Sequence, residues 1–225
     1  MAIDTEDHTV LSNIALAIAR AASEYGCDGT ALLADAGIDP DDAQEPDSRI
    51  SVVAHQRLWR LAIDRTDNPC LAIKVGEALP PGAVHGLGLG WLASDTLKSA
   101  LERLVRFQRL VSTNADIQLT ETNDCYELIG QPRRTPKNFE PASADALMVL
   151  TLHLCRLALS KSVSPREVHL AHNPRTCLGA YEAYFGCTVI SNAPRYALVF
   201  NKALMEQILP GANPLLARIN DDAVR

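Results

Sequence analysis

The sequence predicts an α+β fold: a helical N-terminal half followed by a small, mainly antiparallel sheet packed with a buried central helix. Three observations predict it. Apolar residues recur every three to four positions through the first half of the chain, as amphipathic helices require. Over residues 115–129 the apolar period changes to two, which is typical of strands with one buried face. Residues 142–159 are apolar nearly all round, which indicates a helix in the middle of the domain.

Helices dominate the first half of the predicted fold. We expect a first helix over residues 9–25 and a short second one over residues 29–36, each ending at a glycine. Ser51 can cap a third helix that runs to about residue 65, and a short helix over residues 70–78 follows. Another helix is expected to begin at residues 94–96, a Ser-Asp-Thr sequence with capping side chains, and to end at about residue 110.

Strands and helices alternate in the second half. Two strand segments flank a polar turn and predict a hairpin. Three further strands and a last short helix, which Asn201 can cap and Pro210 ends, complete the expected elements. No repeat and no flexible linker divides the chain, so we expect residues 1–225 to form a single domain. The expected strands are residues 115–120, 125–129, 167–171, 187–190 and 196–201.

Charge and composition narrow the function. The chain has 21 Lys and Arg against 27 Asp and Glu, a net charge of −6. It therefore lacks the broad positive field that draws proteins to nucleic-acid phosphates. The N-terminus is acidic, unlike a signal peptide, and no stretch approaches the roughly 18 apolar residues of a membrane span. We expect a cytoplasmic protein without a membrane partner. Its scattered cysteines, expected as reduced and mostly buried thiols, are Cys27, Cys70, Cys125, Cys155, Cys177 and Cys187.

The sequence gives little support for a catalytic or cofactor-binding motif. We therefore expect that the protein is not an enzyme and that it has no catalytic residues and no cofactor. The chain contains no Gly-x-Ser-x-Gly nucleophile motif. The glycines at positions 86, 88 and 90 lack both the dinucleotide spacing and the Gly-Lys-Ser/Thr ending of a phosphate loop. We interpret them as positions where one helix or turn approaches another closely.

A metal site is not expected either. His169, His172, Cys177 and Cys187 are zinc-type donors, but structural zinc sites use tight paired spacings. Two histidines three residues apart in a strand also point to opposite faces. Buried thiols and a surface histidine are the favoured interpretation.

Two further features have both a structural and a functional interpretation. Arg103, Arg106 and Arg109 recur every three residues beside Phe107. They form either a clamp for an anionic ligand or a solvated helix face, and the solvated face is favoured for Arg103 at least. His153 lies midway along the apolar helix and is either a hydrogen-bonded core histidine or a residue of a ligand pocket.

Short motifs along nearly the whole chain occur in an informative order. The principal ones are Ala36-Gly37-Ile38, Arg49-Ile50-Ser51, residues 71–77, residues 94–110, Tyr184-Phe185-Gly186-Cys187 and residues 209–214. In combination they resemble the N-terminal effector-binding domain of AraC/XylS-type transcriptional regulators, often labelled an arabinose-binding-type domain. The resemblance implies a ligand-sensing and dimerising module, and thus a small-molecule effector of unknown identity and a homodimer. It also implies that DNA is reached only through a C-terminal helix-turn-helix domain, expected beyond residue 225.

Effector pockets of this kind are apolar with a few convergent polar groups. Five residues combine those properties and are the candidate ligand-binding residues: His85, Trp91, Arg109, Tyr126 and His153. Three alternatives stay open. One is a stand-alone small-molecule or haem-binding sensor with His153 or His85 as axial ligand. The others are an enzyme whose catalytic set is not visible in one sequence and a purely dimerising scaffold.

Overall fold

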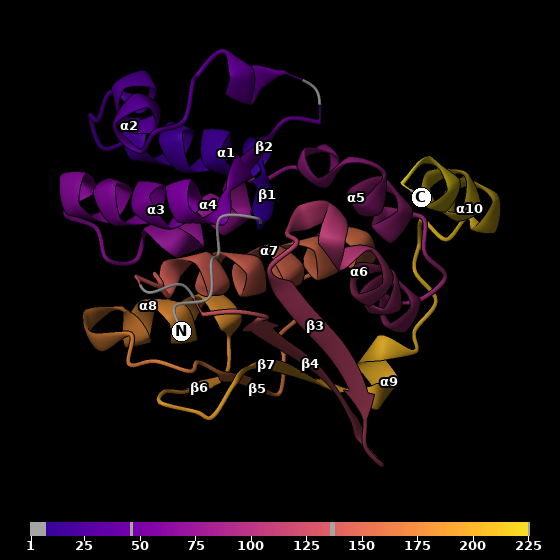
Figure 1. Ribbon diagram of the computed structural model, residues 1–225. Coiled ribbons are helices and arrows are strands. Elements are labelled where there is room, and N and C mark those ends of the chain that lie inside the picture. The colour runs from indigo at the N-terminus through magenta and orange to yellow at the C-terminus, as the bar shows by residue number, and fades with distance from the viewer. Residues whose placement is uncertain (1–7, 46, 136–137, 225) are drawn as a thin grey trace.

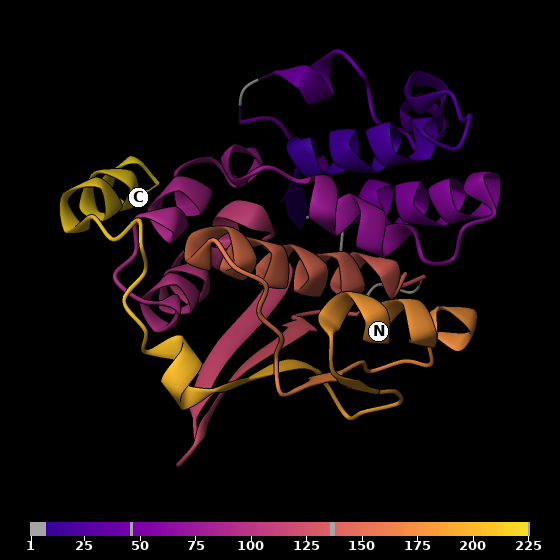
Figure 2. The same ribbon diagram turned by 180° about the vertical axis from the view of Figure 1, so that it is seen from behind.

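A single helix, α7 (Ala142–Leu159), forms the middle layer of the fold. The computed structural model describes residues 8–45, 47–135 and 138–224. In Figure 1 the first four helices lie on one side of α7 and a five-stranded sheet lies on the other, and Figure 2 shows the same layers from behind. The predicted α+β fold, with a helical first half and a buried central helix, is confirmed.

The N-terminal half forms largely as its capping and periodicity signals predict. Ser51 caps α3, its side chain accepting a hydrogen bond from the backbone N–H of Ala54 at 3.1 Å. The prediction of a helix from residue 9 is wrong for its first three residues, which form a strand pairing antiparallel with residues 49–51. This pairing joins distant segments and leaves no local signal. The elements are β1 (Thr9–Leu11), α1 (Ser12–Ser23), α2 (Gly29–Asp35), β2 (Arg49–Ser51), α3 (Val52–Thr66) and α4 (Leu71–Ala78).

Three helices lie together at one end of the molecule: α5 (His85–Leu92), α6 (Leu97–Val111) and α10 (Pro214–Ala223). The predicted helix start at residues 94–96 is confirmed, and Thr96 caps α6 through a reciprocal bond pair with Ser99. The glycines at positions 86, 88 and 90 lie on α5. A Cβ at Gly88 would stand 1.9 Å from the carbonyl oxygen of Pro81, so the interpretation of these glycines as close-approach positions is confirmed. The sequence did not predict α5 or α10.

The sheet has the strand order β3-β4-β7-β5-β6, with only the β5–β6 pair parallel. The predicted hairpin is β3–β4, and all five strands occur where expected. The last predicted helix is shorter than expected: α9 ends at Met205, and Asn201 makes no capping bond. The remaining bounds are β3 (Ala115–Glu121), β4 (Cys125–Pro132), β5 (Glu167–His169), α8 (Leu178–Phe185, not predicted), β6 (Thr188–Ile190), β7 (Tyr196–Asn201) and α9 (Lys202–Met205).

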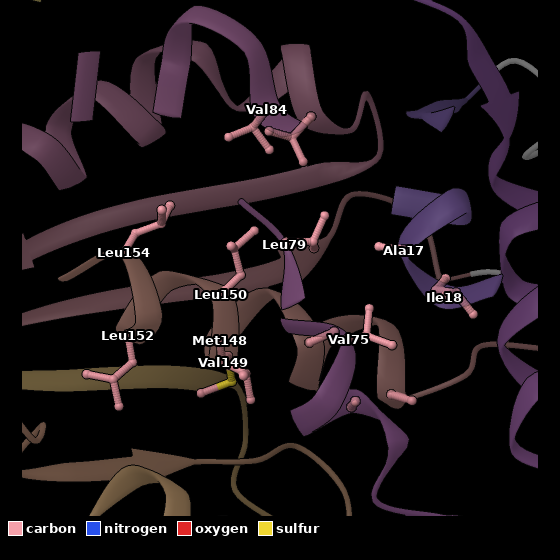
Figure 3. Close-up of a cluster of buried hydrophobic side chains, with 14 of the residues drawn as sticks. Ala17, Ile18, Val75, Leu79, Val84, Met148, Val149, Leu150, Leu152 and Leu154 are labelled. Carbon is pink, nitrogen blue, oxygen red and sulfur yellow. The ribbon is translucent and has the colours of Figure 1, made fainter. Parts of the chain in front are cut away.

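The core surrounds α7. Figure 3 shows Val75 and Leu79 lying beside Val149 and Leu150 of this helix. Gly76 allows the close approach, because a Cβ there would lie 2.5 Å from a methyl group of Val149. By length and hydropathy alone α7 would qualify as a membrane span, contrary to the expectation that no stretch does. Within this fold 67% of the helix is buried by the rest of the domain, and core helices pass the same test.

The expectation of six reduced cysteines is wrong for one pair. Cys70, which precedes α4, and Cys177, which precedes α8, form a disulfide with their Cα atoms 5.5 Å apart. The two residues are 107 positions apart, so only the tertiary fold brings them together. Cys125 and Cys155 are buried free thiols, and burial raises the pKa of Cys155 to about 12.

Candidate ligand-binding cavity

A cavity of about 140 Å³ lies between the N-terminal helices and the sheet, along one side of α7. Both halves of the chain build its wall, since α1 and α3 contribute from one side and β3, β4 and β7 from the other. An adjoining cavity of about 20 Å³ shares five of its wall residues. The lining is Val10, Ile14, Val52, His55, Gln56, Trp59, Leu79, Val111, Ser112, Asn114, Ala115, Ile117, Gly130, Gln131, Pro132, Phe139, Ser143, Ala144, Ala146, Leu147, Met148, Leu150 and Tyr196.

The wall carries no full charge. Among the lining residues just named, none is Asp, Glu, Lys or Arg, and most are aliphatic or aromatic. A mainly apolar wall with a few polar groups is the usual composition of a small-molecule site. An ion entering this space would lose its hydration without gaining an opposite charge, which is costly.

His55 is the most unusual polar residue of the wall. It lies on α3 with 6% of its surface exposed, and its Nε2 accepts a hydrogen bond from Trp59 Nε1 at 3.1 Å. Burial lowers the pKa of His55 to about 4, so the ring is neutral at pH 7. A neutral imidazole has one donor and one acceptor, and the bond from Trp59 assigns the proton to Nδ1.

This Nδ1–H has no hydrogen-bond partner among residues 8–45, 47–135 and 138–224. Nδ1 is not among the fully buried polar atoms that lack a partner, so it faces the open space of the cavity. The wall of the cavity thus contains a hydrogen-bond donor that the protein itself leaves unpaired.

Most other polar side chains of the wall are hydrogen-bonded within the protein. Gln56 donates to Ser143 Oγ at 3.2 Å and accepts from the backbone N–H of Glu140 at 2.5 Å. Asn114 holds the loop after β4 through two bonds to the backbone of Arg134. These contacts fix the wall and leave few polar groups free for a ligand.

Tyr196 joins the wall to a network of polar side chains. Its hydroxyl lies 3.3 Å from His172 Nδ1, and His172 Nε2 lies 3.3 Å from Asp145 Oδ2. The Tyr181 hydroxyl donates to the same carboxylate oxygen at 2.7 Å. Burial raises the pKa of Tyr196 above its ordinary value, which keeps the phenol neutral. This network of side chains connects the sheet to α7 and α8.

None of the five candidate residues from the sequence lines this cavity. Trp91 is a buried residue of α5, and Tyr126 is buried in β4 with its hydroxyl donating to Glu206 at 2.9 Å. Arg109 is exposed in the last turn of α6. The structure therefore does not bring these three together, and their ligand-binding roles stay predictions.

The two candidate histidines also lie elsewhere. His85 begins α5, with its Nε2 3.5 Å from Oδ1 of Asp47. His153 is half-buried on α7, and burial lowers its pKa below the ordinary value. It lines neither cavity. In the part of the chain that the structure describes, no group of three or more His, Cys, Asp or Glu side chains is placed to hold a metal ion.

The interpretation of Arg103 as part of a solvated face is wrong. Its side chain is only 13% exposed, with Nε 2.5 Å and Nη2 3.2 Å from the two carboxylate oxygens of Asp221 in α10. Its Nη1 donates to Ser94 Oγ at 2.6 Å. Arg106 lies farther from Asp221, at 3.7 Å, and is 60% exposed. Arg103 is occupied in holding α10, so no anion clamp forms with it.

Sequence reasoning missed the residues that build the cavity. One local signal existed: His55 and Trp59 are four positions apart on α3, and such pairs lie on the same face of a helix. Tyr196 and Phe139 gave no such signal, because they reach the wall from segments distant in sequence.

The fold and the cavity define a class of protein: an α+β domain with a mainly apolar cavity, lined by no charged side chain among the residues named above, between its helical layer and its sheet. The chain belongs to the family described as the arabinose-binding domain of AraC transcription regulators, N-terminal, whose model matches residues 26–209. It is 22% identical to the ornithine utilization regulator of Pseudomonas aeruginosa, over 85% of this chain and 57% of that protein.

A solved structure shares the fold. The transcriptional regulator CdpR from Pseudomonas aeruginosa matches with a TM-score of 0.63 at 16% identity, over 89% of this chain and 60% of that one. The chain thus spans a little over half the length of the regulators that it resembles. The family membership confirms the resemblance found in the sequence and assigns the chain to transcription regulation.

Proposed function

We propose that this chain is the effector-sensing domain of an AraC-type transcriptional regulator, and that a small molecule bound in the 140 Å³ cavity controls a C-terminal helix-turn-helix domain. One observation carries the proposal. The cavity lies between the two halves of the domain, so its occupant would contact the helical layer and the sheet together. A ligand that prefers one arrangement of these layers shifts the equilibrium towards it, whereas equal affinity for both shifts nothing.

Helix α6 offers a route from the cavity to the C-terminal end. Val111, the last residue of α6, lines the cavity. Arg103, two turns earlier on the same helix, holds α10 through Asp221. A movement of α6 on ligand binding would therefore move α10 as well. In this proposal the DNA-binding domain follows α10, so the position of that helix is transmitted to it.

The names of the relatives do not identify the ligand. Ornithine carries ammonium and carboxylate groups, and among the described wall residues none offers the opposite charge. Arabinose carries several hydroxyl groups, while most polar groups of this wall are already hydrogen-bonded within the protein. We therefore propose an effector of another chemical class. A homodimer, a cytoplasmic location and the absence of catalysis complete the proposed function.

The test compares the full-length regulator with two variants in the cell. Ala144 lines the cavity on α7, and Ala144→Leu places three further carbon atoms in it. Ala183→Leu makes the same change on the exposed side of α8 and serves as the matched control. Genome-wide DNA occupancy is measured across growth media. We expect occupancy to respond to the medium in the wild type and the control, and not in Ala144→Leu. An unchanged response in Ala144→Leu contradicts the proposal.

A further inference from the structure

We infer that the cavity takes an uncharged, mainly apolar molecule about the size of a substituted benzene ring, which presents one hydrogen-bond acceptor to His55 Nδ1. This inference rests on the proposed function, since it names the chemical class of the effector. Three properties of the site carry it: the missing charge, the unpaired donor and the volume.

The absence of charge in the wall excludes ions. A carboxylate or ammonium group inside would be desolvated without a charged partner, because the named wall residues are neutral at pH 7. Arg103, a member of the anion clamp considered in the sequence, is already bound to Asp221 and Ser94. A bound molecule is therefore neutral wherever it meets this wall.

The unpaired donor selects the polar atom of the ligand. His55 is neutral, its Nε2 is occupied by Trp59, and its Nδ1–H finds no partner within the described residues. An acceptor such as a carbonyl oxygen would satisfy this donor. Because Gln56, Ser143 and Asn114 are hydrogen-bonded within the protein, further polar groups on the ligand would add little to its affinity. One acceptor on an apolar body matches the wall.

The volume indicates the size of the group that is held inside. A closed cavity of about 150 Å³ accommodates benzene, and the present cavity, which is partly open to solvent, measures about 140 Å³. A molecule with about six to ten non-hydrogen atoms fits a space of this size. The adjoining cavity of about 20 Å³ leaves room for a short substituent. The aromatic rings of Trp59, Phe139 and Tyr196 in the wall favour a flat, polarisable body.

Three probes of similar size separate these properties. Acetophenone is neutral with one acceptor, ethylbenzene lacks the acceptor, and benzoate is charged. Their affinities for the purified 225-residue chain are measured by calorimetry at pH 7. We expect acetophenone to bind roughly fivefold to tenfold more tightly than ethylbenzene, as one net hydrogen bond allows, and benzoate more weakly than both. Ala144→Leu should weaken both neutral probes at least tenfold, and Ala183→Leu should leave both unchanged.

Two variants test the role of His55. His55→Leu replaces the imidazole with an apolar side chain and removes the donor, so acetophenone and ethylbenzene should bind within twofold of each other. Because His55→Leu leaves the Trp59 N–H unpaired and can unfold the chain, the double variant His55→Leu with Trp59→Phe removes both partners together. It should show the same loss of preference.

The remaining outcomes overturn the inference. Binding of benzoate or L-arabinose more tightly than acetophenone, blocked by Ala144→Leu, would refute the ligand class while supporting the cavity as the effector site. Failure of every probe to bind, or an acetophenone preference that survives both His55 variants, refutes the inference as well. The DNA-occupancy experiment does not use these probes, so failure of the proposed function is detected separately.

Discussion

His55 makes the stability of the domain depend on pH in a direction that the structure fixes. Burial lowers its pKa from 6.5 to about 4 in the folded chain. In the unfolded chain the exposed imidazole takes up a proton near pH 6.5. Between these two values the unfolded state binds more protons than the folded state. The free energy of unfolding therefore falls as the pH falls from about 6.5 towards 4, and this contribution is fully present above that range.

The size of the effect follows from the two pKa values. Lowering the pH from 7 to 5 should remove about 2 kcal/mol from the free energy of unfolding through His55 alone, approaching about 3 kcal/mol below pH 4. Urea denaturation at several pH values measures it. His55→Gln keeps an acceptor for Trp59 and has no titrating ring, so its loss between pH 7 and 5 should be smaller than that of the wild type by this amount.

Leu157→Gln, an exposed change on α7 that adds no titrating group, is the control and should retain the wild-type dependence. If the wild type and His55→Gln lose the same stability between pH 7 and 5, within about 0.5 kcal/mol, the neutral buried imidazole is not a property of the folded chain and the assignment of Nδ1–H as a free donor fails.

Three further predictions concern the packing of the domain. Asp221→Asn leaves the guanidinium of Arg103 partly buried without its counter-charge. The free energy needed to detach α10 should therefore fall by about 3–5 kcal/mol, seen as faster amide exchange confined to α10 and α5. Gly88→Ala places a methyl carbon 1.9 Å from a backbone oxygen, and we expect the variant to unfold at a much lower temperature. Cys177→Ala removes the link to Cys70 across 107 residues, and the oxidised protein should lose about 2–4 kcal/mol of stability by urea denaturation.

Each of these predictions has a matched control in the same chain. Asp39→Asn, in an exposed loop, should leave amide exchange in α10 unchanged. Gly82→Ala meets no atom within 4 Å and should barely alter the melting temperature. Cys27→Ser changes a free cysteine and should preserve stability under oxidising conditions. Equal effects of a variant and its control would refute the corresponding explanation.

Local interactions made much of the fold predictable from the sequence. The cap at Ser51, the cap at Thr96 and the apolar run of α7 each act within a few residues, and each element formed where predicted. The alternating hairpin did the same, because strand periodicity is also a local pattern. The glycine-rich α5 was missed, since three glycines argue against a helix in isolation and its contacts with α6, α7, α10 and the segment around Pro81 stabilise it.

The sequence by itself determined the α+β class, most helices and strands, the acidic character and the family. The tertiary structure decided which side chains meet. It placed the cavity between segments as distant as β1 and β7, left Nδ1 of His55 unpaired, buried Arg103 against α10 and joined Cys70 to Cys177. The physical reason is the range of the interactions. Capping and periodicity act over a few residues, whereas a cavity, a buried ion pair and a disulfide depend on which distant segments pack together.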